Sequence, residues 1–217
     1  AILPIMPQLV ARELRYILEH SEARVIITSE ELTAKVLEAS NGLTTLQHVL
    51  ITGNSESEGA RSISQEIEAA SPIENLHDRA SDDLALLVYT SGTTGKSKGV
   101  MQSHSNVVSN AEACEHLLIS EPMTVGMGVL PMAHVYGVLM MNIGSLSGTV
   151  EVLHPQFETK KVLEDIEKYK AQRISFVPTM MSYLINFPDY DKYDVSSLER
   201  VNSGGAPLPN EVRLEFE

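Results

Sequence analysis

Short apolar runs alternate with helical patterns along most of this chain, and no other feature constrains its fold as strongly. The segments 24–28 and 46–52 each contain three consecutive apolar residues, at 25–27 and 49–51, and a helical pattern precedes each segment, at 12–20 and 29–39. Continuous apolar strands separated by helices are typical of parallel sheets that are covered on both faces. The sequence therefore predicts an α/β fold of layered, mostly parallel β-sheets flanked by helices.

The alternation resumes after a polar interval at 53–83, which contains one weakly helical piece at 64–69. We expect this interval to be a surface connection, either a linker at a domain boundary or a looped insertion within one domain. Further strands are predicted at 84–89, 99–102, 125–130, 149–153, 174–177 and 200–202. Further helices are predicted at 104–118, 137–146, 160–169, 180–186 and from 209 onward.

Serine residues mark two of the expected helix starts. Ser29 precedes the helical pattern that runs towards Ala39, and Ser103 and Ser105 both lie at the start of the helix predicted at 104–118. A serine hydroxyl can accept a hydrogen bond from a free backbone N–H at a helix start. We expect Ser29 to cap the first of these helices and one of the other two serines to cap the second.

The segment from Pro122 to Val150 lacks Lys, Arg, Asp and Glu, and it is longer than the about 20 apolar residues that a bilayer requires. Pro131 and several glycines divide it into short pieces, whereas a helix in lipid must keep its backbone hydrogen-bonded within the segment. We therefore expect a buried strand, a helix and a second strand here, and no transmembrane segment.

Composition narrows the class of partner. The 217 residues are 43% hydrophobic and 21% charged, as in an ordinary globular protein, with a formal net charge of −13. That charge disfavours nucleic acid, whose binding depends on clustered Lys and Arg. Cys114 is the only cysteine, so an internal disulfide is impossible and a reducing, cytoplasmic location is expected. The first residues carry no secretory signal pattern.

The segment YTSGTTGKSKG at 89–99 contains the letters GKS that end a Walker A loop. A Walker A loop requires glycine at position 90, where this chain has Thr90, and it leads into a helix, whereas 99–102 has the pattern of a strand. The segment instead concentrates hydroxyls, glycines and lysines, which suits a clamp for a polyphosphate. The alternative for Lys96 and Lys98 is two solvated loop lysines.

This segment, with the HSN that begins the next predicted helix, resembles the signature loop of the adenylate-forming enzymes: acyl-CoA synthetases, beetle luciferases and peptide-synthetase adenylation domains. Other motifs follow in the order of that family over nearly the whole chain. They are LPMAHVYG at 130–137, GTVEVLHPQF at 148–157, VPTMMSYL at 177–184 and SLERVNSGGAPLP at 197–209.

The resemblance implies ATP-dependent activation of a carboxylic acid, in particular a fatty acid, to an acyl-adenylate with release of pyrophosphate. Transfer of the acyl group to CoA would follow. ATP, CoA and the acid would be the partners, with Mg²⁺ as the metal ion. Two alternatives stay open: an adenylation domain that loads a carrier protein, and an inactive nucleotide-binding fragment.

The resemblance also implies roles for individual residues. His134 would orient the acyl carboxylate, although an isolated histidine in an apolar run can equally be a hydrogen-bonded core residue. Lys96 lies where the family varies and ranks below Lys98. Thr94 would also contact the metal. The residues implied to bind ATP are Thr90, Ser91, Gly92, Thr93, Thr94 and Lys98.

The implied acyl and adenine pocket comprises Tyr136, Gly204, Gly205, Ala206 and Pro207. Ordinary helix packing is the alternative role for Tyr136. A simple turn is the alternative for the glycines, and Met180 and Met181 can be pocket wall or core filler.

Two differences from the family affect these expectations. Many CoA-using relatives have a basic residue where this chain has Gln156, which weakens the expectation of CoA as acceptor. The chain also resembles only part of the large N-terminal domain, with a sub-boundary near 53–83 and without the small C-terminal domain that carries a catalytic lysine. We therefore expect this polypeptide alone to be inactive in adenylate formation.

Overall fold

The computed structural model describes residues 1–53, 55, 57–90, 97–118 and 124–217, with the backbone alone at 116–118. The chain forms two compact units. The first unit comprises residues 1–4, 81–88 and 101–217, and the second comprises 5–80 and 89–100. Each unit is described by itself.

The second unit contains a parallel three-stranded sheet in the order β1-β2-β3, formed by β1 (Val25–Thr28), β2 (His48–Ile51) and β3 (Arg61–Ser62). Its helices are α1 (Ala11–His20), α2 (Thr33–Ser40) and α3 (Ile63–Ala69), with a 3₁₀ turn, η1, at Glu30–Leu32. Leu14 and Leu18 of α1 and Val36 of α2 pack with Ile26 and Ile51 in one core. The predicted strand and helix order in this part of the chain is confirmed.

Three local predictions in this unit are wrong. Arg61–Ser62 adds a strand within the interval expected to be a surface connection, and Ser62 is fully buried. Ser29 precedes η1 without a side-chain cap, because α2 begins later, after Leu32. Strand β1 is buried on one face only, where the helices pack, and Val25 and Ile27 are 47% and 57% exposed.

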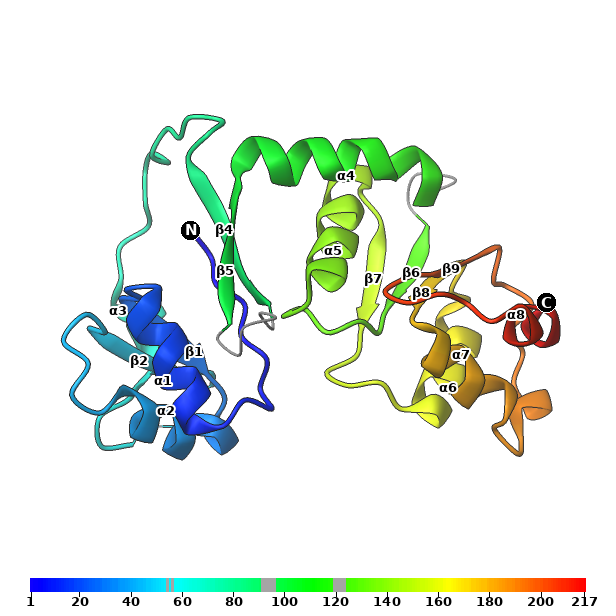
Figure 1. Ribbon diagram of the computed structural model, residues 1–217, viewed down its shortest axis with the longest axis horizontal. Coiled ribbons are helices and arrows are strands. Elements are labelled where there is room, and N and C mark those ends of the chain that lie inside the picture. The colour runs from blue at the N-terminus through cyan, green and yellow to red at the C-terminus, as the bar shows by residue number, and fades with distance from the viewer. Residues whose placement is uncertain (54, 56, 91–96, 119–123) are drawn as a thin grey trace. The chain divides into compact units, whose positions relative to one another are not determined.

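The first unit is built on a parallel four-stranded sheet in the order β7-β6-β8-β9 (Figure 1). The sheet comprises β6 (Val125–Gly128), β7 (Val150–Leu153), β8 (Arg173–Phe176) and β9 (Arg200–Ser203). The register pairs Met127 with both Val152 and Ile174. These four strands confirm the expected α/β class with parallel pairing.

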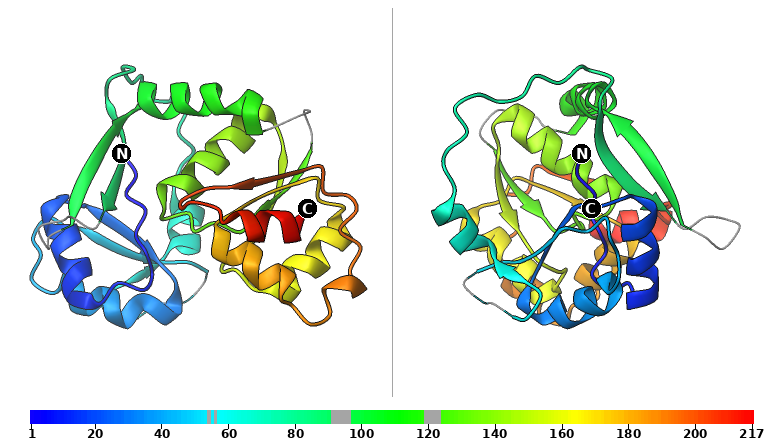
Figure 2. Two further views of the ribbon diagram at one scale, coloured as in Figure 1. Left: turned by 45° about the vertical axis from the view of Figure 1, so that its right-hand side comes forward. Right: turned by 90° about the vertical axis from the view of Figure 1, so that its left-hand side faces the viewer.

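Helices cover both faces of this sheet. On one face, Ile174 and Phe176 of β8 pack in the main core with α6 (Thr159–Tyr169) and α7 (Pro178–Ile185). On the other face, Ser175 donates a hydrogen bond to Sδ of Met140 in α5 (Val135–Ser147), at 3.0 Å. The helix α4 (His104–Leu118) packs across α5 at a steep angle, as Figures 1 and 2 show, and α8 (Asn210–Phe216) contacts α7.

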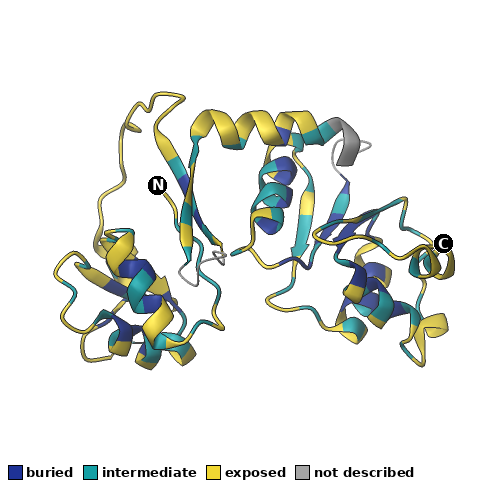
Figure 3. Cartoon of the chain, viewed as in Figure 1, coloured by how far each residue is buried: buried dark blue, intermediate teal, exposed yellow. Residues whose placement is uncertain are grey.

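Strands β4 (Leu84–Thr90) and β5 (Lys98–Ser103) pair in a separate two-stranded sheet. Ser103 caps α4: its hydroxyl accepts from the backbone N–H of Asn106 at 3.2 Å, and the Asn106 side chain accepts from the backbone N–H of Ser103 at 3.1 Å. The first turns of α4 are mostly exposed (Figure 3). Of the two serines considered, Ser103 is therefore the cap.

The segment from Pro122 to Val150 that lacks charged residues folds, where it is described, as β6, α5 and the first residue of β7. Among the described residues, no helix combines the length and the apolar character needed to cross a membrane.

Candidate active site

Three of the motif segments follow strands of the four-stranded sheet. The segment with His134 and Tyr136 follows β6, the segment beginning at Val177 follows β8, and the glycine pair at 204–205 follows β9. Because the strands are parallel, their carboxyl ends lie at one edge of the sheet, which is where α/β proteins commonly bind ligands. The fold therefore gathers these motifs at a single edge, although His134 and Gly205 are 71 positions apart in the chain.

His134 lies at the N-terminus of α5, exposed to solvent, and caps the helix. Its Nδ1 accepts a hydrogen bond from the backbone N–H of Tyr136 at 3.2 Å. A neutral imidazole that accepts at Nδ1 carries its proton on Nε2. Because this histidine is exposed, it is not the buried core residue that the sequence left open, and its Nε2–H is available to an acceptor.

Tyr136 packs directly against the glycine segment after β9. A Cβ placed on Gly204 would lie 2.8 Å from Cε1 of the Tyr136 ring, so only glycine fits this position without displacing the ring. The N–H of Gly204 donates to the carbonyl oxygen of Phe176 at 3.0 Å, which holds the segment to the end of β8. The structure thus brings two of the predicted pocket residues into contact.

The other predicted pocket residues lie beside this contact. Gly205 has φ +80°, a left-handed conformation that favours glycine, and it approaches Val177. Ala206 and Pro207 follow as exposed residues. Val177, Met180 and Tyr136 all pack against one small buried cluster between α4 and α5, whereas Met181 belongs to the main core.

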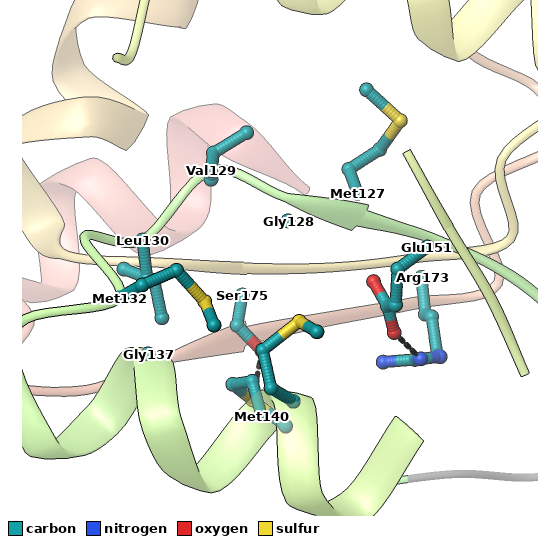
Figure 4. Close-up of a pocket in the computed structure, with 11 residues that line it drawn as sticks. Met127, Gly128, Val129, Leu130, Met132, Gly137, Met140, Glu151, Arg173 and Ser175 are labelled. Carbon is teal, nitrogen blue, oxygen red and sulfur yellow. Dashed lines mark hydrogen bonds and ion pairs between the residues drawn. The ribbon is translucent and has the colours of Figure 1, made fainter. Parts of the chain in front are cut away.

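A small cavity lies between the four-stranded sheet and the first turns of α5 (Figure 4). Glu151 and Arg173 form an ion pair at its wall, and Arg173 also donates to Oγ1 of Thr149 at 2.7 Å. Burial lowers the pKa of Arg173 from its ordinary value. The cavity measures only about 20 Å³, so the ion pair contributes to the sheet interior and is not a ligand site.

A larger cleft of about 490 Å³ opens between α4 and α5. Val135, Tyr136 and Leu139 of α5 line it, opposite side chains of α4. All of its lining residues are uncharged, and several offer amide or hydroxyl groups: Gln102, Asn106, Ser109, Asn110 and Asn142. Sequence reasoning did not identify these residues, and the signal that could have revealed them is the spacing of Asn106 and Asn110, one helical turn apart on α4.

Of the implied ATP-binding residues, the two that the structure describes belong to the second unit. Thr90 and Lys98 end β4 and begin β5, and both are exposed. Ser91, Gly92, Thr93, Thr94 and Lys96 lie outside the described residues, so their predicted roles stay predictions. Among the residues that are described, no group of three His, Cys, Asp or Glu side chains could hold a metal ion.

Comparison with known protein families matches the family described as AMP-binding enzyme over residues 1–217. Acyl-CoA synthetase 7 of Caenorhabditis elegans is 31% identical over 224 residues, which cover 97% of this chain and 41% of that protein. The long-chain-fatty-acid–CoA ligase of Bacillus subtilis (strain 168) is 38% identical over 138 residues, which cover 62% of this chain and 25% of that protein.

A solved structure, that of ATP-bound MatB from Rhodopseudomonas palustris, is also similar in fold. It is 27% identical with a TM-score of 0.84, and the match covers 99% of this chain and 41% of that chain. This chain belongs to the AMP-binding enzyme family. It spans about two fifths or less of the length of these relatives.

Proposed function

We propose that this chain is part of an enzyme that activates a carboxylic acid with ATP and transfers the acyl group to CoA. In the first step a carboxylate oxygen attacks the α-phosphorus, the bond to the β-phosphate breaks, and pyrophosphate leaves with the electron pair. In the second step the CoA thiolate attacks the acyl carbon and displaces AMP. The names of the relatives, which include acyl-CoA synthetases and CoA ligases, support this reaction class.

The observation that carries the proposal is the contact of Tyr136 with Gly204 at the carboxyl edge of the sheet, beside the cleft between α4 and α5. At Gly204 the Tyr136 ring already fills the place that a side chain would take, whereas Gly205 is exposed and carries no side chain. Tyr136 supplies an aromatic wall that also lines the cleft. We propose that an adenine or acyl group lies along the exposed backbone of residues 205–207, beside the Tyr136 ring, and continues into the cleft.

His134 would orient the acid. With Nδ1 occupied by the backbone of Tyr136, its Nε2–H is the group that can donate to a carboxylate oxygen. A fixed donor of this kind holds the nucleophilic oxygen in position and reduces the repulsion between two anions. The imidazole would act as a positioning donor and not as a general base, because a carboxylate has no proton to remove.

The phosphate side would be held by Thr90, Ser91, Gly92, Thr93, Thr94 and Lys98. Hydroxyl and backbone N–H groups donate to phosphate oxygens, and the Lys98 ammonium balances the charge of the leaving pyrophosphate. Thr94 offers an oxygen of the kind that Mg²⁺ accepts, and the ion, when bound, would neutralise phosphate charge.

The cleft favours an uncharged acyl group. Apolar contacts from Val135 and Leu139 suit an aliphatic chain or an aromatic ring, and the amides of Asn106 and Asn110 can meet a neutral polar substituent. A second carboxylate would enter without a cation to pair with among the lining residues, at the cost of its desolvation. We therefore propose a fatty or aryl monocarboxylic acid.

A carrier protein is the alternative acyl acceptor. Gln156, which follows β7, is exposed and uncharged, so it cannot pair with a CoA phosphate as a cation does. Supplying CoA or a phosphopantetheinylated carrier protein to the enzyme with preformed acyl-adenylate distinguishes the two. If only the carrier protein receives the acyl group, the carrier protein replaces CoA as the proposed acceptor.

Binding of an acyl-sulfamoyl-adenosine, in which a sulfamate replaces the phosphate of the adenylate, tests the proposal on this 217-residue chain. Calorimetry should show the octanoyl compound binding at least about tenfold more tightly than AMP, because each CH₂ that enters the cleft contributes about 0.8 kcal/mol. The corresponding compound from a dicarboxylic acid should bind more weakly than the octanoyl compound. Equal affinity for AMP and the octanoyl compound would contradict the proposed acyl site.

The variant His134→Asn isolates the role of the histidine. Asparagine is a good N-cap, and its carbonyl can replace Nδ1 at the backbone of Tyr136, but it lacks the Nε2–H donor. Affinity for the octanoyl compound should fall about tenfold, as expected for a hydrogen bond to a charged group, while the melting temperature stays the same. The matched control His77→Asn, at an exposed histidine of the second unit, should change neither quantity.

We propose that the chain on its own binds nucleotide but does not form adenylate at a useful rate, because it spans about two fifths of the length of the acyl-CoA synthetase relative. Pyrophosphate exchange into ATP, measured with an added fatty acid, should therefore stay at background. Robust exchange would show that these 217 residues suffice for the first step.

A further inference from the structure

One helix contacts both flanks of the signature segment. Within the second unit, the Tyr16 hydroxyl of α1 donates to the backbone carbonyl of Ser97 at 3.1 Å. One turn further along α1, Nδ1 of His20 lies 2.7 Å from the Tyr89 hydroxyl. Tyr89 directly precedes Thr90 and Ser97 directly precedes Lys98. Thr90 and Lys98 are the two proposed phosphate-binding residues that the structure describes. Each of them therefore directly follows a residue that contacts α1.

We call these two contacts, Tyr16 with Ser97 and His20 with Tyr89, the tethers, and ring contacts join them. The rings of Tyr16 and His20 are stacked with centroids 5.4 Å apart, and the Tyr89 ring meets the His20 ring edge-on at 5.8 Å. The geometry is that of an i, i+4 pair on a helix, so a single turn of α1 presents both contacts. Burial, and secondarily the neighbouring Tyr16, raises the pKa of Tyr89 above its ordinary value.

The helix that carries these side chains is itself firmly held. Leu14, Ile17 and Leu18 of α1 are at most 4% exposed. Arg15 also ties the helix to the end of α2 by donating to the carbonyl oxygens of Ala39 and Asn41, at 3.2 and 2.6 Å. A contact to α1 therefore ties the flanks to a rigid part of the second unit.

We propose that Tyr16 and His20 are positioning residues that hold the Tyr89 and Ser97 flanks so that Thr90 and Lys98 act on the same polyphosphate. The inference rests on the proposed ATP binding, and it assigns to α1 a part in phosphate recognition although neither side chain is proposed to contact the nucleotide. When the flanks are already ordered before ATP binds, less conformational entropy is lost on binding, and the affinity is higher. Loss of either tether should weaken the phosphate contacts and spare the contacts to adenosine.

The test compares ATP with adenosine on this chain. Tyr16→Phe keeps the ring that stacks on His20 and removes only the donor to Ser97. One hydrogen bond of this kind should change ATP affinity about fivefold, with adenosine affinity unchanged. His20→Ala should have a similar effect, and His20→Asn, whose carbonyl can replace Nδ1 as acceptor for Tyr89, should restore most of the affinity.

The control is Arg15→Gln, which removes a tertiary contact of the same helix that does not involve Tyr89 or Ser97. It should leave the ATP-to-adenosine affinity ratio at the wild-type value, even if it lowers the melting temperature. Amide hydrogen exchange at Thr90 and Lys98 gives a second readout without nucleotide. It should accelerate in Tyr16→Phe and His20→Ala and stay unchanged in Arg15→Gln.

The outcomes separate the inference from the function on which it rests. If the wild-type chain binds ATP and both Tyr16→Phe and His20→Ala bind it equally well, the positioning role is wrong and the proposed ATP binding stands. If Arg15→Gln weakens ATP as much as Tyr16→Phe, the contacts are merely structural. If the wild-type chain does not bind ATP, the nucleotide proposal fails, and the positioning role fails with it.

Discussion

Gly137 is the residue on which the turn before α5 depends most directly. A Cβ at this position would lie 2.2 Å from the carbonyl oxygen of Pro131, which already accepts the N–H of His134 at 3.0 Å. Gly137→Ala should therefore destabilise the fold by about 1–3 kcal/mol, because backbone must move to admit the methyl group. Chemical denaturation measures the change, and affinity for an acyl-adenylate mimic should fall with it.

Gly144→Ala is the matched control in the same helix. Its Cβ would have side-chain atoms of Thr149 and Glu151 as its three nearest neighbours, at 3.1 Å or more, whereas the nearest neighbour at Gly137 is a backbone carbonyl. In both variants the replacement of glycine by alanine favours the helical conformation by the same amount, about 1 kcal/mol. Gly144→Ala should be near neutral, and a loss equal to that of Gly137→Ala would contradict the role assigned to the Pro131 carbonyl.

His154 is subject to two opposing effects within the first unit. Its side chain is 4% exposed, and Nε2 lies 3.5 Å from Oδ2 of Asp165, which is also paired with Lys161 at 2.9 Å. Burial lowers the pKa of His154 more than the Asp165 carboxylate raises it. NMR titration should place this pKa below the ordinary value of 6.5. Asp165→Asn should lower it further, and Lys161→Met should raise it.

The lowered pKa of His154 has a consequence for stability with a definite sign. The folded state favours the neutral imidazole, so the unfolded state binds more protons once the pH drops below about 6.5. The contribution of His154 is complete above that pH and is lost as the pH falls through the folded pKa. As the pH drops below about 6.5, the unfolding free energy of the wild-type chain should fall more steeply than that of His154→Gln. A steeper fall in the variant would show that the ion pair dominates.

At the scale of elements, the start of α4 offers a clean comparison of two serines. Ser103 caps the helix through a reciprocal pair of hydrogen bonds with Asn106, whereas the backbone N–H of Ser105 bonds to Ser81. Ser103→Ala should lower the unfolding free energy by about 1 kcal/mol. Ser105→Ala should have little effect. Thermal unfolding of both variants measures the difference, and equal losses would contradict the cap.

Element boundaries were predictable where the local pattern is strong and long. The helix expected at 104–118 has these bounds in the structure, and the helix expected at 12–20 begins only one residue earlier. Strand β3 was not predicted because a strand of two residues is too short to show a periodic hydrophobic pattern. Ser62 is buried there by its pairing with β2 and its hydrogen bond to the Gly53 carbonyl at 2.7 Å, both of which are tertiary effects.

At the scale of the whole molecule, each unit has its own core. Among the described residues, the core around α1 and α2 shares none of its members with the core around α6 and β8. Leu18→Ala in α1 and Ile166→Ala in α6 each truncate a side chain that is 1% exposed, at a cost of about 2–5 kcal/mol. Leu18→Ala should accelerate amide exchange in β1 and β2 far more than in β8, and Ile166→Ala should do the reverse.

Ile67→Ala serves as control for this comparison, because Ile67 is 67% exposed and its truncation should leave exchange in both sheets nearly unchanged. Equal acceleration of both sheets by Leu18→Ala would mean that the two units open as one cooperative body.

The sequence alone determined the class of fold and the family. Alternating apolar strands and helices specify a parallel sheet because pattern and propensity act over a few residues, and the motifs at 89–99, 130–137 and 197–209 are local as well. The two lysines of the signature segment, the single histidine before α5 and the glycine pair after β9 are all recognisable from these local motifs.

Only the tertiary structure decided which of these residues meet. The ring of Tyr136 rests on Gly204, 68 positions later, because both follow parallel strands that end at one edge. The cleft between α4 and α5 and the tethers from Tyr16 and His20 to Ser97 and Tyr89 likewise join residues far apart in the chain. Such contacts depend on packing across strands and helices, and no local pattern records which distant partner a side chain will find.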